Sequence, residues 1–392
     1  MATALDGIRV LDLSRLFPGP LCTMFLADLG ADVLKVEDPV QGDYMRWLPP
    51  YAGRYGAQFM ALNRNKRSMK LNLKAEKGRD IFLRLVEGFD VVVESFRPGV
   101  MDRLGVGYEE ARARNPRIIY CAVTGYGQDG PYRDKPGHDI NYAGYAGAVG
   151  LTGPPGGAPV VPGVQVADVG GGALMAAIGI LAALIARERT GTGQFVDVSM
   201  MDGVVAWLAL YAAAMFAGEP APDRGTHTLT GGSPVYQVYE TKDRKYVTTG
   251  NLEPKFWKEL CRLVGREDLA DSQFEEGAGR ERVFAIMREI FRTRTRDEWM
   301  DFFEGKDVCV GPVNTLEEAL ADPQIVSRGM VVELDHPGGG KMKHVRNPVK
   351  LSGTPPVVRA AAPGFGEHTA EVLGEIGIGG DEVEALRKEN VV

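Results

Sequence analysis

The sequence of this chain predicts an α/β fold built on a parallel sheet with helices on its faces. Over the first hundred or so residues, short apolar runs alternate with helical segments, which is the pattern of successive β-α-β units. Gly and Pro punctuate these segments. The chain has 392 residues, which is too many for one ordinary core, so a second domain is expected.

The expected elements of the first domain follow one another in a regular order. A buried strand over 8–13 leads through a Pro/Gly turn into a helix over 21–29, which Gly30 ends. The alternation of strand and helix then continues over 32–37, 78–86, 90–94, 108–115 and 117–123. An apolar helix over 169–188, a strand over 194–198 and a second apolar helix over about 201–216 complete this part.

The second half of the chain predicts a smaller α+β domain. Residues 218–232 are rich in Gly and Pro and indicate a domain connection. A hairpin is expected over 236–248, and helices are expected near 254–264, 280–293, 296–304, 316–321 and 381–388. We therefore predict a large domain over 1–217, completed by the tail 340–392, and a small domain with its linkers over 218–339.

Composition excludes several classes of function. The net charge is −7, from 45 basic and 52 acidic residues, whereas a nucleic-acid binder is normally basic. The four cysteines are far apart and form no CxxC pair, which argues against a zinc site or a disulfide framework. The N-terminus lacks a basic region followed by an apolar core, so a cytoplasmic location is expected.

One apolar segment has nearly the length of a membrane span. Residues 169–186 carry no charge, but they are rich in Gly and Ala and are followed directly by Arg187, Glu188 and Arg189. A buried helix of the large domain explains this composition better than a transmembrane helix does. No membrane partner is expected.

A histidine and two aspartates mark a candidate site. His138 and Asp139 lie in the irregular stretch 124–165, and such long stretches in compact domains are usually functional. A lone histidine is more often a structural, hydrogen-bonded residue, but the adjacent acid and glycines favour chemistry here. Asp168 precedes three glycines at the start of the apolar helix, where it could simply be an N-cap. The glycines would leave the helix end bare, and a bare helix end can receive an oxyanion.

A run of basic residues is a second candidate feature. Five cations lie within residues 64–74, and this pattern fits either a solvated face or a phosphate site that Lys35, Arg97 and Arg103 could join. Glu37 ends the second strand, where a ribose-binding acid would lie in a dinucleotide site. The turn after the first strand contains no GxGxxG, so binding of a nicotinamide or flavin nucleotide is only a weak third choice.

Eight segments together resemble the class III CoA-transferase superfamily, and within it the α-methylacyl-CoA racemases. They are LDGIRVLD (5–12), ADLGADV (27–33), NKRS (65–68), RPGV (97–100), GYGQDGP (125–131), GHDINY (137–142), GTGQ (191–194) and GEHT (366–369). The resemblance covers nearly the whole chain.

The resemblance implies a Rossmann-like large domain, a smaller domain and an interlocked homodimer. The active site is then expected between the large domain of one subunit and the small domain of the other. CoA is expected on the large domain near Lys35, Lys66, Arg67, Phe96 and Arg103, with Arg97 as a further contact. CoA enters as part of the substrate, and no metal or other cofactor is expected.

The resemblance also implies roles for the acidic residues and the histidine. Asp168 matches the aspartate used throughout the superfamily, and His138 matches a histidine that the racemases carry and the transferases generally lack. Asp139 and Glu253 match acids that partner Asp168 and His138, respectively. From the residues alone, Glu253 could be a boundary residue before a helix. Asp38 stands where racemases often carry Arg, so the charge is reversed at part of the expected phosphate contact.

These residues predict an acyl-CoA racemase that acts on a 2-methylacyl-CoA. His138 and Asp168 would remove the α-proton from one face of the thioester and return a proton to the other. A neighbouring carboxylate, Asp139, would raise the pKa of Asp168, and Glu253 would orient His138. The enolate oxygen would face N–H groups near residues 170–172. The main alternative is a CoA-transferase in which Asp168 is a nucleophile; a CoA-binding protein without turnover is a third possibility.

Overall fold

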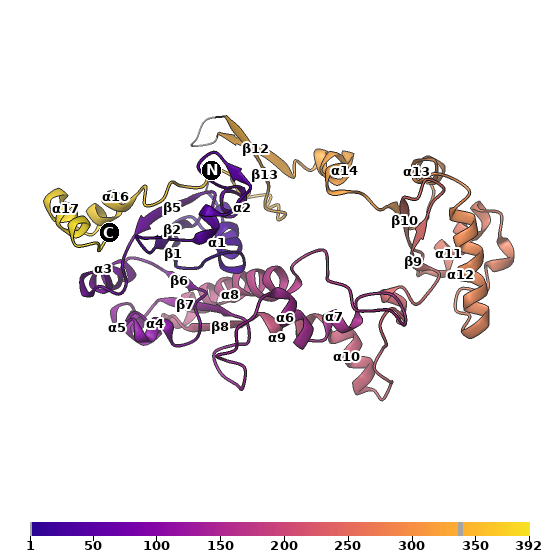
Figure 1. The fold of residues 1–392 in the computed structure, drawn as a ribbon, viewed down its shortest axis with the longest axis horizontal. Helices are drawn as coiled ribbons and strands as arrows, with labels where there is room; N and C mark the ends of the chain where they lie inside the picture. The colour runs from indigo at the N-terminus through magenta and orange to yellow at the C-terminus, as the bar shows by residue number, and fades with distance from the viewer. Residues whose placement is uncertain (1, 336–339) are drawn as a thin grey trace. The chain divides into compact units, whose positions relative to one another are not determined.

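The computed structural model of this chain describes residues 2–335 and 340–392 (Figure 1). The described chain divides into two compact units. The first unit takes the chain up to Ala146, together with Gly163–Trp207 and Pro323–Val392, and the second takes Gly147–Pro162 and Leu208–Asp322.

The first unit is built on a six-stranded parallel sheet, as the sequence predicts. Its strands are β1 (Arg9–Asp12), β2 (Asp32–Glu37), β5 (Lys66–Lys70), β6 (Val91–Glu94), β7 (Ile119–Thr124) and β8 (Phe195–Ser199). They lie in the order β5-β2-β1-β6-β7-β8, and every neighbouring pair is parallel. From β1 the chain builds the sheet outward through β2 and β5, and β6 then starts the other half beside β1. The order of the strands therefore reverses between β1 and β6, and ligands of open α/β sheets bind at the carboxyl ends of strands at such a point.

Helices and short strands complete the first unit. They are α1 (Pro18–Asp28), η1 (Tyr44–Trp47), β3 (Tyr51–Ala52), β4 (Tyr55–Gly56), α2 (Ala57–Leu62), α3 (Glu76–Val86), α4 (Val100–Arg103), α5 (Tyr108–Arg114), α6 (Asp139–Tyr145), η2 (Val166–Leu174), α8 (Met175–Thr190), α9 (Met200–Trp207), α15 (Pro323–Ser327), β12 (Val331–Asp335), β13 (Lys341–Val345), α16 (Thr369–Glu375) and α17 (Gly380–Lys388). Pro at the first helical position starts α1, and Gly30 follows its end with a positive φ of 112°.

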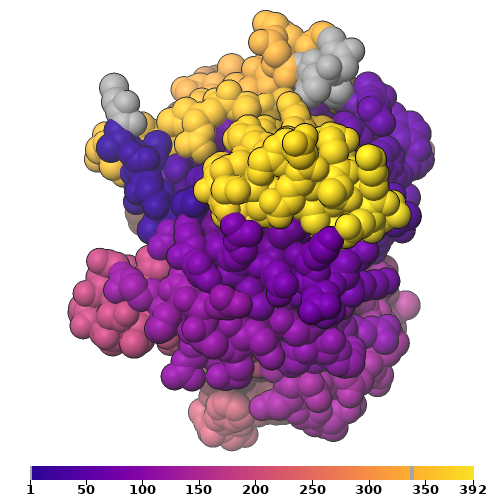
Figure 2. Space-filling view, turned by 90° about the vertical axis from the view of Figure 1, so that its left-hand side faces the viewer, coloured from indigo at the N-terminus to yellow at the C-terminus, as the bar shows by residue number. Residues whose placement is uncertain are grey.

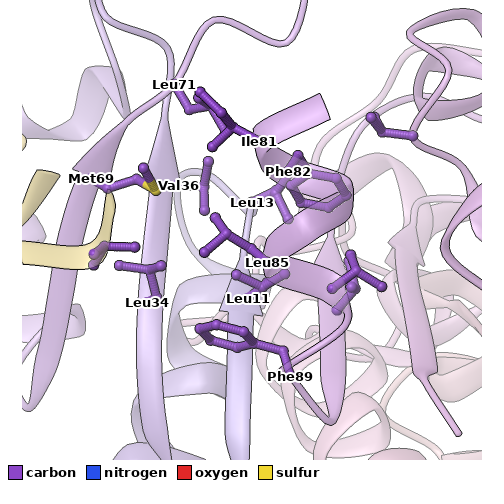
Figure 3. Close-up of a cluster of buried hydrophobic side chains, with 14 of the residues drawn as sticks. Leu11, Leu13, Leu34, Val36, Met69, Leu71, Ile81, Phe82, Leu85 and Phe89 are labelled. Atoms are coloured by element: carbon purple, nitrogen blue, oxygen red, sulfur yellow. The ribbon is translucent and has the colours of Figure 1, made fainter. Parts of the chain in front are cut away.

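One apolar core joins the sheet to α3 and to the C-terminal tail. Leu11, Leu34 and Met69 extend from three neighbouring strands and pack with Phe82 and Leu85 of α3 (Figure 3). Val372 and Leu373 of α16 belong to the same core, and the tail (yellow) lies against the N-terminal part of this unit in Figure 2. The tail is also tied to the sheet edge, because His368 N donates to Ser68 O at 2.8 Å.

The apolar helix expected over 169–188 begins earlier and in an unusual form. Residues Val166–Leu174 form a π-helix, η2, which continues directly into α8. The segment Val166–Thr190 is long and apolar enough to cross a membrane, with a mean hydropathy of 2.2 and 44% of that window buried. Buried residues of α8 include Ile180 and Leu184, and the helix packs on β7 and β8. This packing agrees with the predicted helix of the large domain.

The second unit contains a three-stranded antiparallel sheet and several helices. Its elements are α7 (Ala148–Leu151), α10 (Ala209–Phe216), η3 (Thr228–Thr230), β9 (Tyr236–Glu240), β10 (Tyr246–Gly250), α11 (Pro254–Leu263), η4 (Glu267–Leu269), α12 (Gly277–Phe291), α13 (Arg296–Phe303), β11 (Val310–Pro312) and α14 (Leu316–Ala321). The predicted hairpin is confirmed by the antiparallel pairing of β9 with β10. Trp257, Phe291 and Trp299 lie in the apolar core of this unit.

The units differ from the predicted domain boundaries at three places. Residues 147–162 belong to the second unit, because Arg224 donates to the carbonyls of Gly150 and Gly157. Residues 208–217 also belong to it. Residues 323–335 belong instead to the first unit, where β12 pairs with β13 and Val345 O accepts a bond from Arg64. Residues 336–339, the last four of the predicted small domain, lie outside the described residues.

Candidate active site

A cavity of about 590 Å³ lies at the carboxyl ends of the parallel strands of the first unit. Its wall includes residues 15, 16 and 18 after β1, residues 95–98 after β6 and residues 123–125 at the end of β7. This is the place where the strand order reverses, so the topology of the sheet itself positions the cavity. His138 and Asp168 both line it.

His138 is fixed by its backbone at the start of a helix. It is the N-cap of α6, and its N–H donates to Asn141 Oδ1 at 3.0 Å. Its carbonyl accepts from the N–H of Asn141 at 2.8 Å and of Tyr142 at 3.3 Å. Asn141 and Tyr142 also line the cavity. The hydrogen-bonded start of α6 thus fixes the backbone of His138 in the cavity wall.

Asp139 follows His138 in the chain and binds the backbone of Asp168. Its Oδ1 accepts from the N–H groups of Ala167 at 2.7 Å and of Asp168 at 2.9 Å. The N-cap of α6 therefore provides the imidazole in the cavity, and the first residue of α6 provides the acceptor that holds the start of η2. The interpretation of Asp168 as an N-cap is wrong, since Gln165 occupies that position and Asp139 satisfies the N–H groups instead.

The electrostatics of the cavity raise the pKa of the Asp168 carboxyl from 3.8 to about 6. Burial is the largest cause, and the negative charge of Asp139 adds to it, while His138 acts in the opposite direction. A carboxyl group with this pKa exchanges its proton near neutral pH, as a general acid or base must. π-Helical turns are rare and occur mostly at functional sites, and Asp168 lies within one.

The three glycines after Asp168 serve packing, which corrects the expectation that they bare the helix end for an oxyanion. A Cβ on Gly170 would lie 1.5 Å from the Trp207 ring, and one on Gly171 would lie 2.2 Å from Met200 O. Gly172 is similarly enclosed by Met200 and Pro18. The absence of side chains therefore lets η2 approach α9 and α1 closely. The N–H groups that open the helix already bind the Asp139 carboxylate.

Two arginines converge beside the cavity, and a third lines it. A Cβ placed on Gly99 would lie 3.2 Å from an Arg103 nitrogen and 3.3 Å from an Arg133 nitrogen, so the two guanidinium groups converge on one point. Arg97 and Arg133 line the cavity. None of the three has an acidic partner within the described residues 2–335 and 340–392. Converging unpaired guanidinium groups form a site for phosphate or carboxylate.

Phe96 forms another part of the wall. The Arg15 guanidinium lies 5.1 Å from the centre of the Phe96 ring, and it pairs with Asp38 at 3.4 Å. Asp38 also accepts from the N–H groups of residues 40–42. Asp38 therefore fixes its own turn and neutralises a cation of the cavity wall.

Glu94 holds the loop that carries Phe96 and Arg97. Its Oε2 accepts from Phe96 N at 2.7 Å, and the side chain is buried at the end of β6. Burial, with a smaller contribution from Asp102, raises its pKa to about 8. The loop after β6 is thus anchored by a carboxyl group that favours its neutral form.

Comparison with known proteins identifies the family. The chain matches CoA-transferase family III over residues 5–369. The chain belongs to this family. It is 36% identical to a succinyl-CoA:glutarate CoA-transferase of Homo sapiens over 95% of this chain and 86% of that one. It is also 36% identical to an alpha-methylacyl-CoA racemase of Homo sapiens over 99% of this chain and 97% of that one.

The fold comparison agrees with the sequence comparison. A solved structure of a CAIB/BAIF family protein from Brucella suis superposes with a TM-score of 0.84 and 34% identity, over 96% of this chain and all of that one. Family membership therefore establishes a CoA-transferase family III enzyme fold. The chain is equally identical to a transferase and to a racemase, so sequence identity does not distinguish the two reactions.

Three residues expected near CoA lie elsewhere in the family III fold of this chain. Lys35 and Lys66 are buried: Lys35 Nζ lies 3.2 Å from Asp43, and Lys66 Nζ lies 2.9 Å from Asp12. These ion pairs neutralise both lysines inside the first unit, and neither residue lines the cavity. The expectation that they contact CoA is corrected to a structural role.

Arg67 also lies away from the cavity. It pairs with Asp32 at 2.7 Å and with Glu371 and Glu375 of the tail. Asp32 begins β2, and Arg67 lies near the start of β5. The pair therefore lies at the amino ends of the parallel strands, whereas the cavity lies at their carboxyl ends. Arg67 therefore joins the tail to the sheet and does not face a ligand in the cavity.

Glu253 belongs to the second unit. It is the N-cap of α11 and precedes Pro254, which fits its interpretation as a boundary residue. Its relation to His138 stays a prediction. Among the described residues 2–335 and 340–392, no group of three or more His, Cys, Asp or Glu side chains could hold a metal ion.

Sequence reasoning missed two cations of the cavity wall, Arg133 and Lys135. Both lie in the loop just before His138, and their proximity to that residue in the chain was the available signal. It also missed the buried acid Asp12, although an aspartate inside an otherwise apolar strand indicates a buried partner.

Proposed function

We propose that this chain is an acyl-CoA racemase, which inverts the α-carbon of a 2-methylacyl-CoA thioester. The observation that carries the proposal is the presence of His138 and Asp168 in the wall of one cavity, with the Asp168 pKa raised to about 6. Two proton-transfer groups in the wall of one cavity are what inversion through a planar enolate requires.

The proposed reaction moves one proton off the α-carbon and one proton onto it. One of the two groups, unprotonated, accepts the α-hydrogen, and the electron pair of the C–H bond moves into the enolate. The other group, protonated, then donates to the opposite face and restores the C–H bond. Asp139 supports both roles, because it holds the Asp168 backbone and its charge favours the protonated form of Asp168.

CoA is proposed to bind with its phosphates at the arginines beside the cavity. Arg97, Arg103 and Arg133 offer unpaired guanidinium groups, which suit the diphosphate and 3′-phosphate groups. Arg15 contributes less charge because Asp38 pairs with it. No metal or redox cofactor is needed for this chemistry, and the proposed location is the cytoplasm.

We propose further that two copies form an interlocked homodimer in which Glu253 of one copy stabilises the His138 imidazole of the other. In support, the first unit exposes large apolar side chains along α8 and α9, including Ile178, Ile185 and Trp207. Exposed apolar surface of this kind marks an interaction site. Glu253→Gln would then slow inversion because the variant side chain lacks the charge that stabilises His138 of the other copy. Sedimentation would show whether the protein forms a dimer.

The second candidate function is CoA transfer between carboxylic acids. It is favoured by the position of Asp168 in a cavity beside unpaired arginines and by the transferases among the relatives. In that reaction the Asp168 carboxylate would attack the thioester carbonyl and form an acyl-aspartate while CoA leaves as a thiolate. Inversion uses His138 directly, whereas this step makes no use of it.

A stereochemical assay separates the two functions. We expect the wild-type protein to convert one enantiomer of a 2-methylacyl-CoA into the other without any carboxylate acceptor. His138→Ala and Asp168→Asn should abolish inversion while CoA affinity is kept. The transferase proposal is supported instead if hydroxylamine traps, or mass spectrometry detects, an acyl or CoA adduct on Asp168. It also requires that His138→Ala still transfers CoA.

A further inference from the structure

A second cavity lies in the first unit, at the open end of the hairpin that β12 and β13 form (Figure 1). Its volume is about 320 Å³, and all its lining residues belong to the first unit. Val331 of β12 pairs with Val345 of β13, so the residues just before β12 and just after β13 are brought together. The Arg346 N–H donates to Met330 O at 2.8 Å and continues this pairing into the cavity wall.

The second cavity lies at the end of α1 that is remote from the candidate active site. Pro18, at the start of α1, lines the active-site cavity, whereas Asp28, at the end of α1, lines the second cavity. The Val357 N–H donates to Asp28 O at 2.8 Å. Arg64 joins the Asp28 carboxylate, at 2.7 Å, to Val345 O, at 2.8 Å. Hydrogen bonds therefore fix α1, the hairpin and the chain that follows it to one another around the cavity.

Three exposed cations line the second cavity without acidic partners. The Lys350 Nζ donates to Arg328 O at 2.7 Å, so these two residues are held together. A Cβ placed on Gly329 would lie 3.7 Å from an Arg346 guanidinium nitrogen. None of the three cations pairs with a carboxylate in the part of the chain that the structure describes. Asp28 is the only acid among the described lining residues, and its own ion pair neutralises it.

A buried amide in the same wall has an unused hydrogen-bond donor. Asn347 is 8% exposed and lines the cavity. Its Oδ1 accepts from Val349 N at 3.0 Å, whereas its Nδ2 donates to no atom of the described chain. Buried polar groups normally have a hydrogen-bond partner. The free Nδ2 group beside three cations therefore indicates that the cavity accommodates an anionic acceptor.

Apolar side chains form the rest of the wall. They are Met330, Val349, Leu351, Pro355, Pro356 and Val358. Sites for small molecules combine an apolar surface of this kind with a few polar groups that fix the orientation of the ligand, and their volumes begin at about 300 Å³. The composition and the volume therefore fit a small ligand that has one anionic end and one apolar end.

We propose that this second cavity binds a small organic phosphate monoester. Its phosphate group would lie at Arg328, Arg346 and Lys350, with a further hydrogen bond from Asn347, and its apolar part would lie against the prolines. A phosphate monoester carries a charge of about −1.5 to −2 at neutral pH, and guanidinium and ammonium groups suit it. The site lies apart from the cavity of Asp168 and takes no part in the proposed reaction.

Two methionines provide one reporter in each cavity. Met330 lines the second cavity and Met200 lines the candidate active site, and no other methionine of the described residues lines either one. In the full chain with isotope-labelled methionine methyl groups, phenyl phosphate should shift the Met330 resonance with a Kd of about 1 mM or tighter. Met330→Leu assigns that resonance. Benzoate has one charge and inorganic phosphate has no apolar part, so each should bind at least about 5-fold more weakly.

Charge and amide variants test the proposed contacts. Arg328→Gln and Arg346→Gln should each weaken the binding of phenyl phosphate about 10-fold or more. Asn347→Asp keeps the acceptor for Val349 N but replaces the donor by a negative charge, so it should weaken binding by at least as much. Lys343→Gln removes an exposed cation of β13 outside the cavity and should change the Kd less than about 2-fold. An unchanged thermal unfolding midpoint shows that each variant folds.

Four results would overturn the inference. The first is a Met330 resonance that does not move at about 10 mM phenyl phosphate. The second is equal weakening by Lys343→Gln and Arg346→Gln, which would indicate general attraction of anions. The third is equal affinity for inorganic phosphate, which would indicate an adventitious ion only. The fourth is a shift of Met330 by CoA at the concentration that shifts Met200, which would assign both cavities to CoA.

Discussion

Replacing Asp139 by Asn should lower the pKa of Asp168 while keeping the geometry of the site. The Asn Oδ1 can still accept from the N–H groups of Ala167 and Asp168, which Asp139 binds at 2.7 and 2.9 Å. Its negative charge is lost, however, and that charge is the second cause, after burial, of the rise from 3.8 to about 6. The whole rise is worth about 3 kcal/mol, and we expect about one pKa unit of it to disappear, or about 1.4 kcal/mol.

The assay is the pH dependence of kcat/KM for inversion of a 2-methylacyl-CoA. Rates fall at low pH as the basic form of the Asp168–His138 pair is protonated, so a lower Asp168 pKa moves this acid limb to lower pH. Asp139→Asn should shift the limb by about one unit, whereas Asp134→Asn, in the exposed loop before α6, should not. An unchanged limb, or one moved to higher pH, would refute the coupling of the two carboxylates.

Three further predictions concern stability. Lys66→Met leaves the buried Asp12 carboxylate without its partner and should cost about 3–5 kcal/mol in urea unfolding, whereas a residue that contacts CoA would change KM instead. Gly170→Ala places a methyl group 1.5 Å from the Trp207 ring and should cost about 1–3 kcal/mol, measured by the same method, unless the backbone shifts. Glu94 has a raised pKa of about 8, so the folded protein keeps a proton that the unfolded chain releases above pH 4.5, and stability falls as pH rises from there to about 8. Glu94→Gln should remove up to about 5 kcal/mol of that fall. A pH slope equal to that of the wild type would contradict it.

The parallel sheet could be predicted because its pattern is local. Each strand is a short apolar run, and each helix that follows is bounded by Gly or Pro, as at Gly30. The order of the strands, by contrast, depends on which helices cover which face, and the sequence carries no local record of it. The domain boundaries differ for the same reason, since a tertiary contact such as Arg224 with Gly150 assigns the loop 147–162 to the second unit.

The common position of His138 and Asp168 in one cavity wall could be predicted better than the positions of the basic residues. His138 and Asp139 lie in an irregular, Gly-rich stretch, and three glycines follow Asp168; both signals are visible in the sequence. The burial of Lys35 and Lys66 could not be seen, because it depends on Asp12 and Asp43 in other segments. A charged residue on a strand gives no local sign of whether it faces a ligand or a buried partner.

The glycines after Asp168 are required by the structure, but for a different reason from the one the sequence predicts. The sequence predicts that their lack of side chains leaves space for an oxyanion, but Gly170 and Gly171 provide space for α9. The sequence showed that side chains had to be absent, and only the packing showed what takes their place.

The most direct test of the central claim is the exchange of the α-hydrogen in deuterated water, followed separately for each enantiomer of a 2-methylacyl-CoA. If His138 and Asp168 act on opposite faces, the wild-type protein exchanges both enantiomers, while His138→Ala and Asp168→Asn each lose inversion and retain exchange of one enantiomer at most, a different one in each variant. Retention of exchange with the same enantiomer in both variants, or inversion that survives either substitution, would contradict the account.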